Sequence, residues 1–103
     1  MDGLEAQLAT AMESLRRLAD VVAVAVARRD GLIISHILPK GSDPKKVAAM
    51  CAALVGTSEV ASRELNQGKF LQSIVEAEDG KVIVALPQSE SGQGVFTALA
   101  QIV

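Results

Sequence analysis

The stretch Asp20–His36, with the sequence DVVAVAVARRDGLIISH, decides the fold. Its first part, Val21–Ala27, has no polar residue, whereas a strand with one face in water alternates apolar and polar side chains. Asp30-Gly31 then interrupts, and Asp-Gly between two apolar runs is a strong hairpin signal because glycine accepts the positive φ of the turn. We therefore predict strands at residues 21–28 and 32–38, the first of them covered on both faces.

The second of these strands carries polar side chains on both of its faces. Ser35 shares a face with Ile33 and Ile37, while His36 lies on the other face. Polarity on both faces is typical of a strand at the edge of a sheet. We therefore expect the second strand at an edge and the first strand inside the sheet.

Two amphipathic helices flank these strands. The first is predicted over residues 3–18, because one stripe of it carries apolar residues at helical spacing: Leu4, Leu8, Met12, Leu15 and Leu18. The second is predicted over residues 44–65, with Ser42 or Asp43 as the cap, Pro44 in the first helical position and Gly68 beyond the end.

The long second helix has more apolar surface than one contact needs. One seam of it carries Val47, Cys51, Leu54, Ser58, Ala61 and Leu65, and alanines cover the neighbouring positions. A helix that is apolar on two sides has two things to pack against. Gly56, a glycine within the helix, is typical of a close approach to another helix backbone. The alternative is that the alanines are present only for their helix propensity, and the sequence favours neither explanation.

Three further strands are predicted in the last third of the chain. Residues 69–77 alternate, Glu78-Asp79-Gly80 predicts a hairpin turn, and residues 81–86 return. Residues 87–94 read as a loop. The tail at 95–103 fits a helix by spacing and a strand by composition, and we predict a strand because β-branched residues and Phe96 dominate it. The 103 residues form one domain.

Composition and charge exclude several classes of function. The formal net charge is −2 and only two residues are aromatic, so the basic stripe and the stacking rings of a nucleic-acid-binding protein are missing. No run approaches the length of a membrane span, and the acidic start MDGLEAQLAT is unlike a signal peptide. We therefore expect no nucleic-acid partner, no membrane insertion and a cytoplasmic location.

Residues that could carry chemistry are few and scattered. His36 is the only histidine and Cys51 the only cysteine, and a packing or surface role is the better interpretation of each. A solvated hairpin end explains the carboxylates Glu76, Glu78 and Asp79 better than a metal site does. Solvated surface is the expectation for Arg28, Arg29 and Arg63. No glycine-rich phosphate loop is present, so we predict no catalytic residue, cofactor or metal, and no enzyme.

The order of these elements resembles the roadblock (dynein light chain) family over about residues 4–103. The segments that carry the resemblance are DVVAVAVARRDGLIIS, AAMCAALVGTSEVASREL and GKFLQSIVEAEDGKVIVALP. The resemblance implies an α+β fold with a five-stranded antiparallel sheet ordered 2-1-5-4-3. The long helix would lie on one face and the N-terminal helix on the other, without the C-terminal helix that many members carry.

The resemblance also implies a homodimer, in which the third strands pair edge to edge and the long helices pack together. The paired strand would be Lys69–Ala77. The expected interface residues are Met50, Ala53, Leu54, Gly56, Thr57 and Ala61 on the helix and Phe70, Leu71, Gln72, Ser73, Ile74 and Val75 on the strand. A spare apolar helix face and an open strand edge, both read from the residues themselves, agree with this.

Family members serve as platforms for Ras-like small GTPases, and some stimulate GTP hydrolysis. The resemblance therefore implies a non-enzymatic regulator or scaffold of such a GTPase. The alternative is an assembly subunit that bridges larger proteins, as motor light chains do, whatever the bound nucleotide. A small-ligand sensor fits less well, because the aliphatic core offers no convergent polar groups.

Overall fold

The computed structural model describes residues 2–17, 21–86 and 95–102. Seven elements follow one another along the chain. They are α1 (Asp2–Arg16), β1 (Val21–Arg28), β2 (Ile33–Ile37), α2 (Pro44–Glu64), β3 (Gln72–Ala77), β4 (Gly80–Ala85) and β5 (Val95–Ile102). The tail is thus a strand, as predicted, and the described residues contain no third helix.

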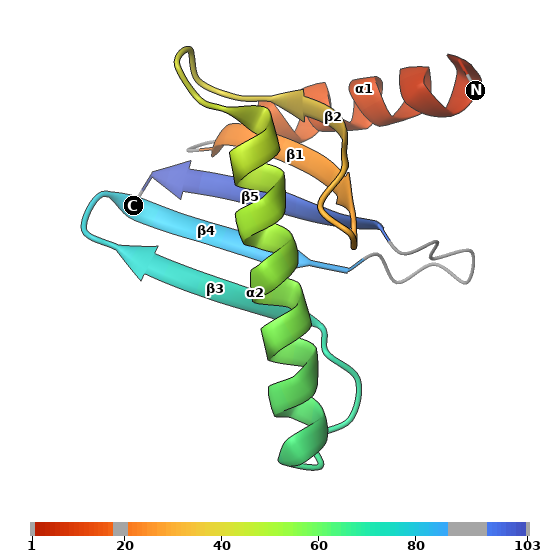
Figure 1. The fold of residues 1–103 in the computed structure, drawn as a ribbon. Helices are drawn as coiled ribbons and strands as arrows, with labels where there is room; N and C mark the ends of the chain where they lie inside the picture. Colours follow the sequence, from red (N-terminus) through yellow and green to blue (C-terminus); the bar gives the residue numbers. More distant parts are fainter. Residues whose placement is uncertain (1, 18–20, 87–94, 103) are drawn as a thin grey trace.

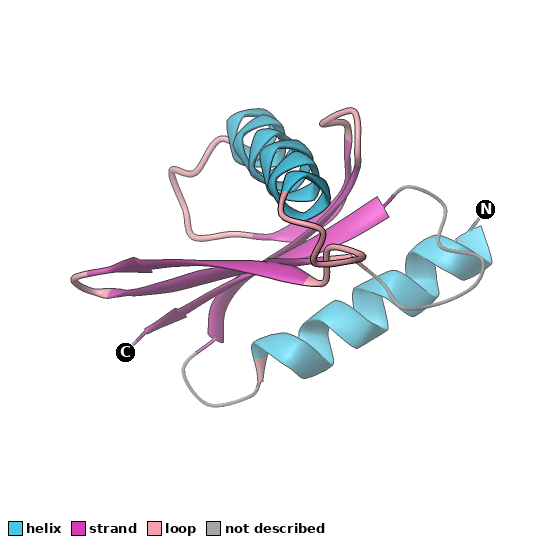
Figure 2. Ribbon diagram, turned by 90° about the horizontal axis from the view of Figure 1, so that it is seen from below, coloured by secondary structure: helices cyan, strands magenta, loops and turns pink. Residues whose placement is uncertain are grey.

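The five strands form one antiparallel sheet in the order β2-β1-β5-β4-β3. The long helix α2 crosses one face of the sheet (Figure 1). The helix α1 lies on the opposite face, so the molecule has three layers (Figure 2). The α+β class, the strand order and the placement of both helices are confirmed.

The strand β1 lies inside the sheet and is covered on both faces, as its uninterrupted apolar run predicts. Val24 and Val26 pack with Met12 of α1, whereas Ala27 packs with Ala48 of α2. The larger valines thus pack on the α1 side and the smaller Ala27 packs on the α2 side. The sequence shows no polar residue here because neither face meets water.

Val22 is the exception in β1, with 40% of its surface exposed. The pairing of β1 with β5 shifts register between Val21 and Ala23. Such a bulge interrupts the regular alternation of side chains between the two faces. Val22 therefore belongs to neither the core beneath α1 nor the core beneath α2.

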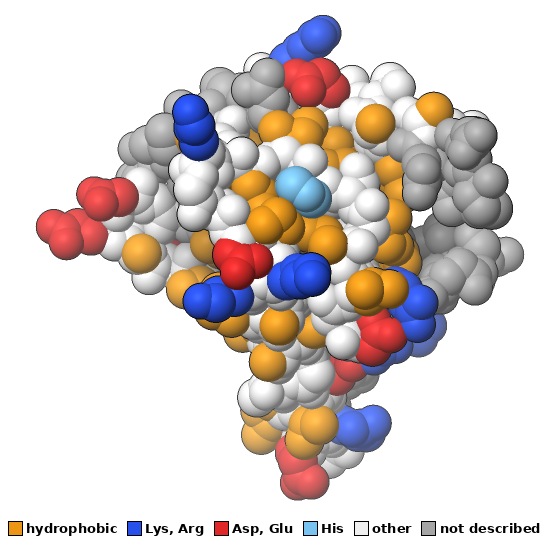
Figure 3. All heavy atoms as spheres, turned by 45° about the horizontal axis from the view of Figure 1, so that its top comes forward, with side chains coloured by type: hydrophobic (Ala, Val, Ile, Leu, Met, Phe, Trp, Pro, Cys, Tyr) orange, Lys and Arg blue, Asp and Glu red, His pale blue; other side chains and the backbone are white. Residues whose placement is uncertain are grey.

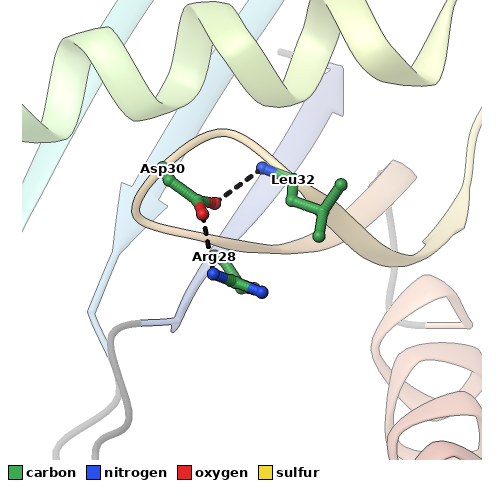
Figure 4. Close-up of polar contacts among 3 residues, drawn as sticks. All are labelled: Arg28, Asp30 and Leu32. Atoms are coloured by element: carbon green, nitrogen blue, oxygen red, sulfur yellow. Dashed lines mark hydrogen bonds and ion pairs between the residues drawn. The ribbon is translucent and has the colours of Figure 1, made fainter.

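The hairpin turn between β1 and β2 is held by one carboxylate (Figure 4). Asp30 accepts a hydrogen bond from the backbone N–H of Leu32 at 3.1 Å and pairs with the Arg28 guanidinium at 2.8 Å. Gly31 has φ of +93°, and a Cβ there would lie 3.5 Å from the Cα of Ala49. The positive φ favours glycine at this turn, while the space beside α2 would admit a Cβ at ordinary contact distance.

The helix α2 begins where the sequence predicts. Asp43 is the cap, and its carboxylate accepts from the N–H groups of Lys45 and Lys46 at 3.0 and 3.4 Å. Pro44 follows in the first turn, where its missing N–H costs nothing. At the other end Leu65 caps the helix, with its N–H donating to the carbonyl of Ala61.

One boundary was predicted wrongly. The third strand begins at Gln72 and not at Lys69, so Phe70 and Leu71 belong to the connection before it. Phe70 alternates with its neighbours as a strand residue would, but its ring packs against the core beneath α2. The other elements agree with the predicted ranges to within two residues at each end that lies within the described segments; Leu18 and the loop at 87–94 fall outside them.

Candidate functional site

The lower part of α2 projects beyond the edge of the sheet (Figure 1). Near the start of this projection the Ser58 hydroxyl lies 2.6 Å from that of Ser73 in β3, within hydrogen-bonding distance. Past this point Ala61 and Leu65 are exposed, Leu65 to 68%. In Figure 3, hydrophobic side chains reach the surface along this projection.

The exposed apolar residues of the projection continue the buried seam of α2. Eleven positions along a helix return a side chain to within about 20° of its starting direction, so Leu65 points to the same side as Leu54. Leu54 is half-buried because the sheet lies beside it. Leu65 has the same direction but no sheet of its own chain beneath it.

The strand β3 forms the edge of the sheet next to this projection. Its pairing with β4 is unbroken from Gln72 to Ala77. Two apolar side chains of β3 are only about half covered: Ile74 is 49% exposed and Val75 is 45% exposed. A regular edge strand with exposed apolar side chains presents unpaired backbone groups with which another chain can pair.

A pocket of about 590 Å³ lies between α2 and the sheet. Met50 and Leu54 of α2 form one wall, and small apolar residues of the strands form the floor, among them Val75 and Val82. Among the described residues of the lining, Ser42 alone carries a hydroxyl group. Such a surface can hold an apolar group, but it offers almost no hydrogen bonds with which to orient a polar ligand.

The structure brings some of the expected interface residues together and separates others. Met50 and Leu54 line the pocket with Val75, and Ala61 lies on the same flank of α2, seven positions after Leu54. Gly56 is two positions from Leu54, about 200° around the helix, so it lies on the other flank. A Cβ at Gly56 would meet nothing within 4 Å. Gly56 is therefore not part of the pocket surface.

The remaining expected residues have mixed positions. Ala53 and Thr57 are exposed on the side of α2 away from the sheet, Leu71 is exposed before β3, and Phe70 is in the core. Gln72, Ser73 and Ile74 lie in β3 itself.

Of the described residues that line the pocket, the sequence analysis assigned only Met50, Leu54 and Val75 to an interface, and it missed the others, among them Val82. It also did not assign the exposed Leu65 of the projection to an interface. The continuing seam at Leu65 was a usable signal. Val82 gave none, because its place in the pocket depends on the strand order.

Residues considered for chemistry occupy ordinary positions. Cys51 is buried in the core, and this burial raises the pKa of its thiol, so the thiol stays neutral. His36 is exposed (Figure 3). Glu76 pairs with Lys81 at 3.5 Å. Within residues 2–17, 21–86 and 95–102, His, Cys, Asp and Glu form no cluster that could hold a metal ion.

The arginines are largely engaged on the surface. Arg28 pairs with Asp30 in the turn, and Arg29 pairs with Glu59 of α2, which ties the hairpin tip to the helix. Arg63 is exposed on the projecting end of α2. In the part of the chain that the structure describes, the helices are too short or too polar to cross a membrane.

Solved structures share this fold. A Roadblock/LC7 domain from Streptomyces avermitilis superposes with a TM-score of 0.76 at 20% identity, covering 88% of this chain and 74% of that one. MglB of Myxococcus xanthus superposes with a TM-score of 0.76 at 16% identity, covering 86% of this chain and 70% of that one. At these identities the likeness concerns the fold.

Comparison of sequences identifies the family. The uncharacterized protein MJ0310 of Methanocaldococcus jannaschii is 32% identical over 74 residues, which are 72% of this chain and 61% of that protein. The chain thus spans about three-fifths of the length of this relative. The model of the Roadblock/LC7 domain matches residues 8–91, most of the chain. With the fold and the sequence in agreement, the chain belongs to the Roadblock/LC7 domain family.

Proposed function

We propose that the chain is a non-enzymatic, homodimeric regulator or scaffold that binds a Ras-like small GTPase. The observation that carries the proposal is the surface shared by α2 and β3: an unpaired strand edge, a projecting helix end and an apolar pocket, side by side. A chain with this surface has a binding role to perform.

The dimer supplies the platform. Edge pairing of β3 joins two sheets into one and leaves both α2 helices on the same side, because an antiparallel pair keeps each face of the sheet continuous. The family resemblance implies that such platforms contact GTPases, whose switch segments change order when GTP is hydrolysed. A platform that contacts those segments would distinguish the two nucleotide states.

The decisive experiment measures binding of the purified chain to Ras-like GTPases from the same cell, each loaded with GDP or with a non-hydrolysable GTP analogue. We expect a complex of one chain dimer with the GTPase in one nucleotide state, and about tenfold or weaker affinity for the other state. Hydrolysis rates with and without the chain then show whether it stimulates the GTPase.

A matched pair of variants shows whether the dimer is required. Ile74→Lys places like charges across the paired edge and should abolish both the dimer and GTPase binding, whereas His36→Lys on the opposite edge should leave both intact. Equal binding in both nucleotide states would favour the bridging subunit instead. Failure of the dimer to bind any of these GTPases would overturn the proposal.

A further inference from the structure

We propose that each copy fills the other's apolar pocket with the last turn of its α2, around a two-fold axis that pairs the β3 strands at Ile74. This inference rests on the homodimer of the proposed function and adds its register and the occupant of the pocket. Four features carry it. They are the alternation of β3 residues between bonding to β4 and facing the open edge, the side chains along that edge, the direction of Leu65 and the composition of the pocket.

The first observation concerns which backbone groups of β3 are free. The N–H of Leu86 donates to the carbonyl of Leu71 at 3.4 Å, so these two opposite residues form a hydrogen-bonded pair. Hydrogen-bonded and non-hydrogen-bonded pairs alternate in an antiparallel ladder. In the continuous register, Ser73 and Val75 therefore bond to β4. Gln72, Ile74 and Glu76 then direct their N–H and C=O groups toward the open edge.

The second observation fixes the register of the two edges. If Ile74 lies opposite the partner's Ile74, then Gln72 lies opposite the partner's Glu76, and every outward group of the strand is paired. A shift to the next register leaves one outward residue of each copy unpaired. The side chains agree, because the isoleucines form an apolar pair and the Gln72 amide can donate to the partner's Glu76 carboxylate.

The third observation is the projecting end of α2. Ser73 and Val75 lie on the α2 face of β3, since Ser73 contacts Ser58 of α2 and Val75 lines the pocket. A two-fold axis at the β3 edge places the partner's sheet under the projecting turn. Leu65, on the same flank as Leu54, then points toward Val75 of the partner subunit and Val82 of the partner subunit.

The fourth observation is that the pocket suits this occupant. Its lining is almost entirely apolar, and the most exposed apolar side chain of the projection is Leu65. Met50 on the wall of the pocket is itself 64% exposed. Both surfaces would lose their contact with water in one step, and symmetry makes this happen twice.

A cysteine scan reads the register directly. In a Cys51→Ala background, single variants Ser73→Cys, Ile74→Cys and Val75→Cys are oxidised, and the disulfide-linked dimer is quantified. In the proposed register the two Cα atoms at position 74 are about 5.5 Å apart, within disulfide range, whereas those at 73 or 75 lie diagonally at about 7–8 Å. We expect Ile74→Cys to cross-link about tenfold faster than either neighbour.

A pair of leucine variants tests the occupant of the pocket. Leu65→Ser should raise the dimer dissociation constant at least about tenfold, since a buried leucine is lost from each side. Leu32→Ser is the control, because Leu32 is also exposed, at 57%, but lies on the hairpin at the far edge of the sheet. The dye 8-anilinonaphthalene-1-sulfonate should bind weakly to the wild-type dimer and more strongly to Leu65→Ser.

The outcomes separate this inference from the proposed function. A dimer that cross-links best at position 73 or 75, or that is unchanged by Leu65→Ser, overturns the inference and leaves the GTPase platform standing. Strong dye binding to the wild-type dimer would show that the pocket is open to small apolar ligands and would overturn the pocket assignment. A monomeric wild-type chain overturns both proposals.

Discussion

The two edges of the sheet, β2 and β3, differ in how they are protected. The pairing of β2 with β1 shifts register between Val26 and Ala27, and α1 packs against β2 through Ile34 and Ile37. The hairpin that carries it is also tied to α2 by Arg29. The strand β3 has an unbroken register, and half of the Ile74 surface is exposed.

The comparison explains which edge is available to a partner. A bulge is one of the usual means by which proteins prevent edge pairing, and the pairing of β2 with β1 has one. The strand β3 is only one residue longer than β2 and α2 packs on one of its faces, but its register with β4 is unbroken. In the proposed dimer, association therefore uses the more regular of the two edges.

The largest effect is expected from Ile74→Pro. The N–H of Ile74 faces the open edge, so proline removes a donor needed for the dimer and none from the ladder with β4. We expect the dimer to weaken by about a hundredfold, about 2–3 kcal/mol, in sedimentation experiments. Val75→Pro is the control: its N–H bonds to β4, so this variant should lower the melting temperature of the chain itself. If the Ile74→Pro dimer stayed intact, the N–H of Ile74 would not take part in the pairing of the two β3 edges.

A smaller effect is expected from a charge placed on the same edge. Gln72→Glu would lie opposite the partner's Glu76 at both ends of the pair, which should weaken the dimer by about tenfold at low salt. The second change Glu76→Gln should restore the affinity, since it exchanges the two partners. His36→Glu on β2 should change nothing. Weakening by His36→Glu would mean that β2 also takes part.

The contact between β3 and α2 can be tested within one chain. Ser73→Ala removes the hydrogen bond between Ser73 and Ser58, and we expect the free energy of unfolding to fall by about 1 kcal/mol in urea titrations of a monomeric variant. The double variant Ser58→Ala/Ser73→Ala should lose less than the sum of the two single losses. Strict additivity would show that the two hydroxyls do not depend on each other.

The smallest effect concerns the flank of α2 away from the pocket. Gly56→Ala should stabilise the chain by about 0.8–1 kcal/mol through helix propensity, because a Cβ there meets open space. The dimer dissociation constant should not change. Gly31→Ala is the opposite case, because its φ of +93° is strained for a residue with a Cβ, and it should destabilise the chain. If Gly56→Ala disrupted the dimer, the helix contact would lie on the Gly56 flank of α2 and not on the Leu54 flank as proposed.

The sequence predicted most of the fold because the local signals were strong and consistent. Asp30-Gly31 marks the turn and Asp43-Pro44 marks the start of α2, and both depend on residues adjacent in sequence. The start of β3 was predicted wrongly at Lys69, since alternation alone cannot distinguish a strand residue from Phe70, a connection residue that packs into the core. Gly56 was assigned to the interface because glycine within a helix is typical of a close backbone approach, and this assignment stays a prediction. The direction in which Gly56 faces depends on where α2 lies on the sheet.

What the sequence alone determined is the set of elements and the apolar surface that each must bury, because hydrophobic periodicity and turn residues act over a few positions. The tertiary structure alone decided which apolar residues remained exposed. Leu54 and Leu65 share one seam of α2, yet only Leu54 is covered, because the sheet ends at β3 before it reaches Leu65. Exposure of this kind depends on the length of a helix relative to the width of a sheet, which no local pattern records.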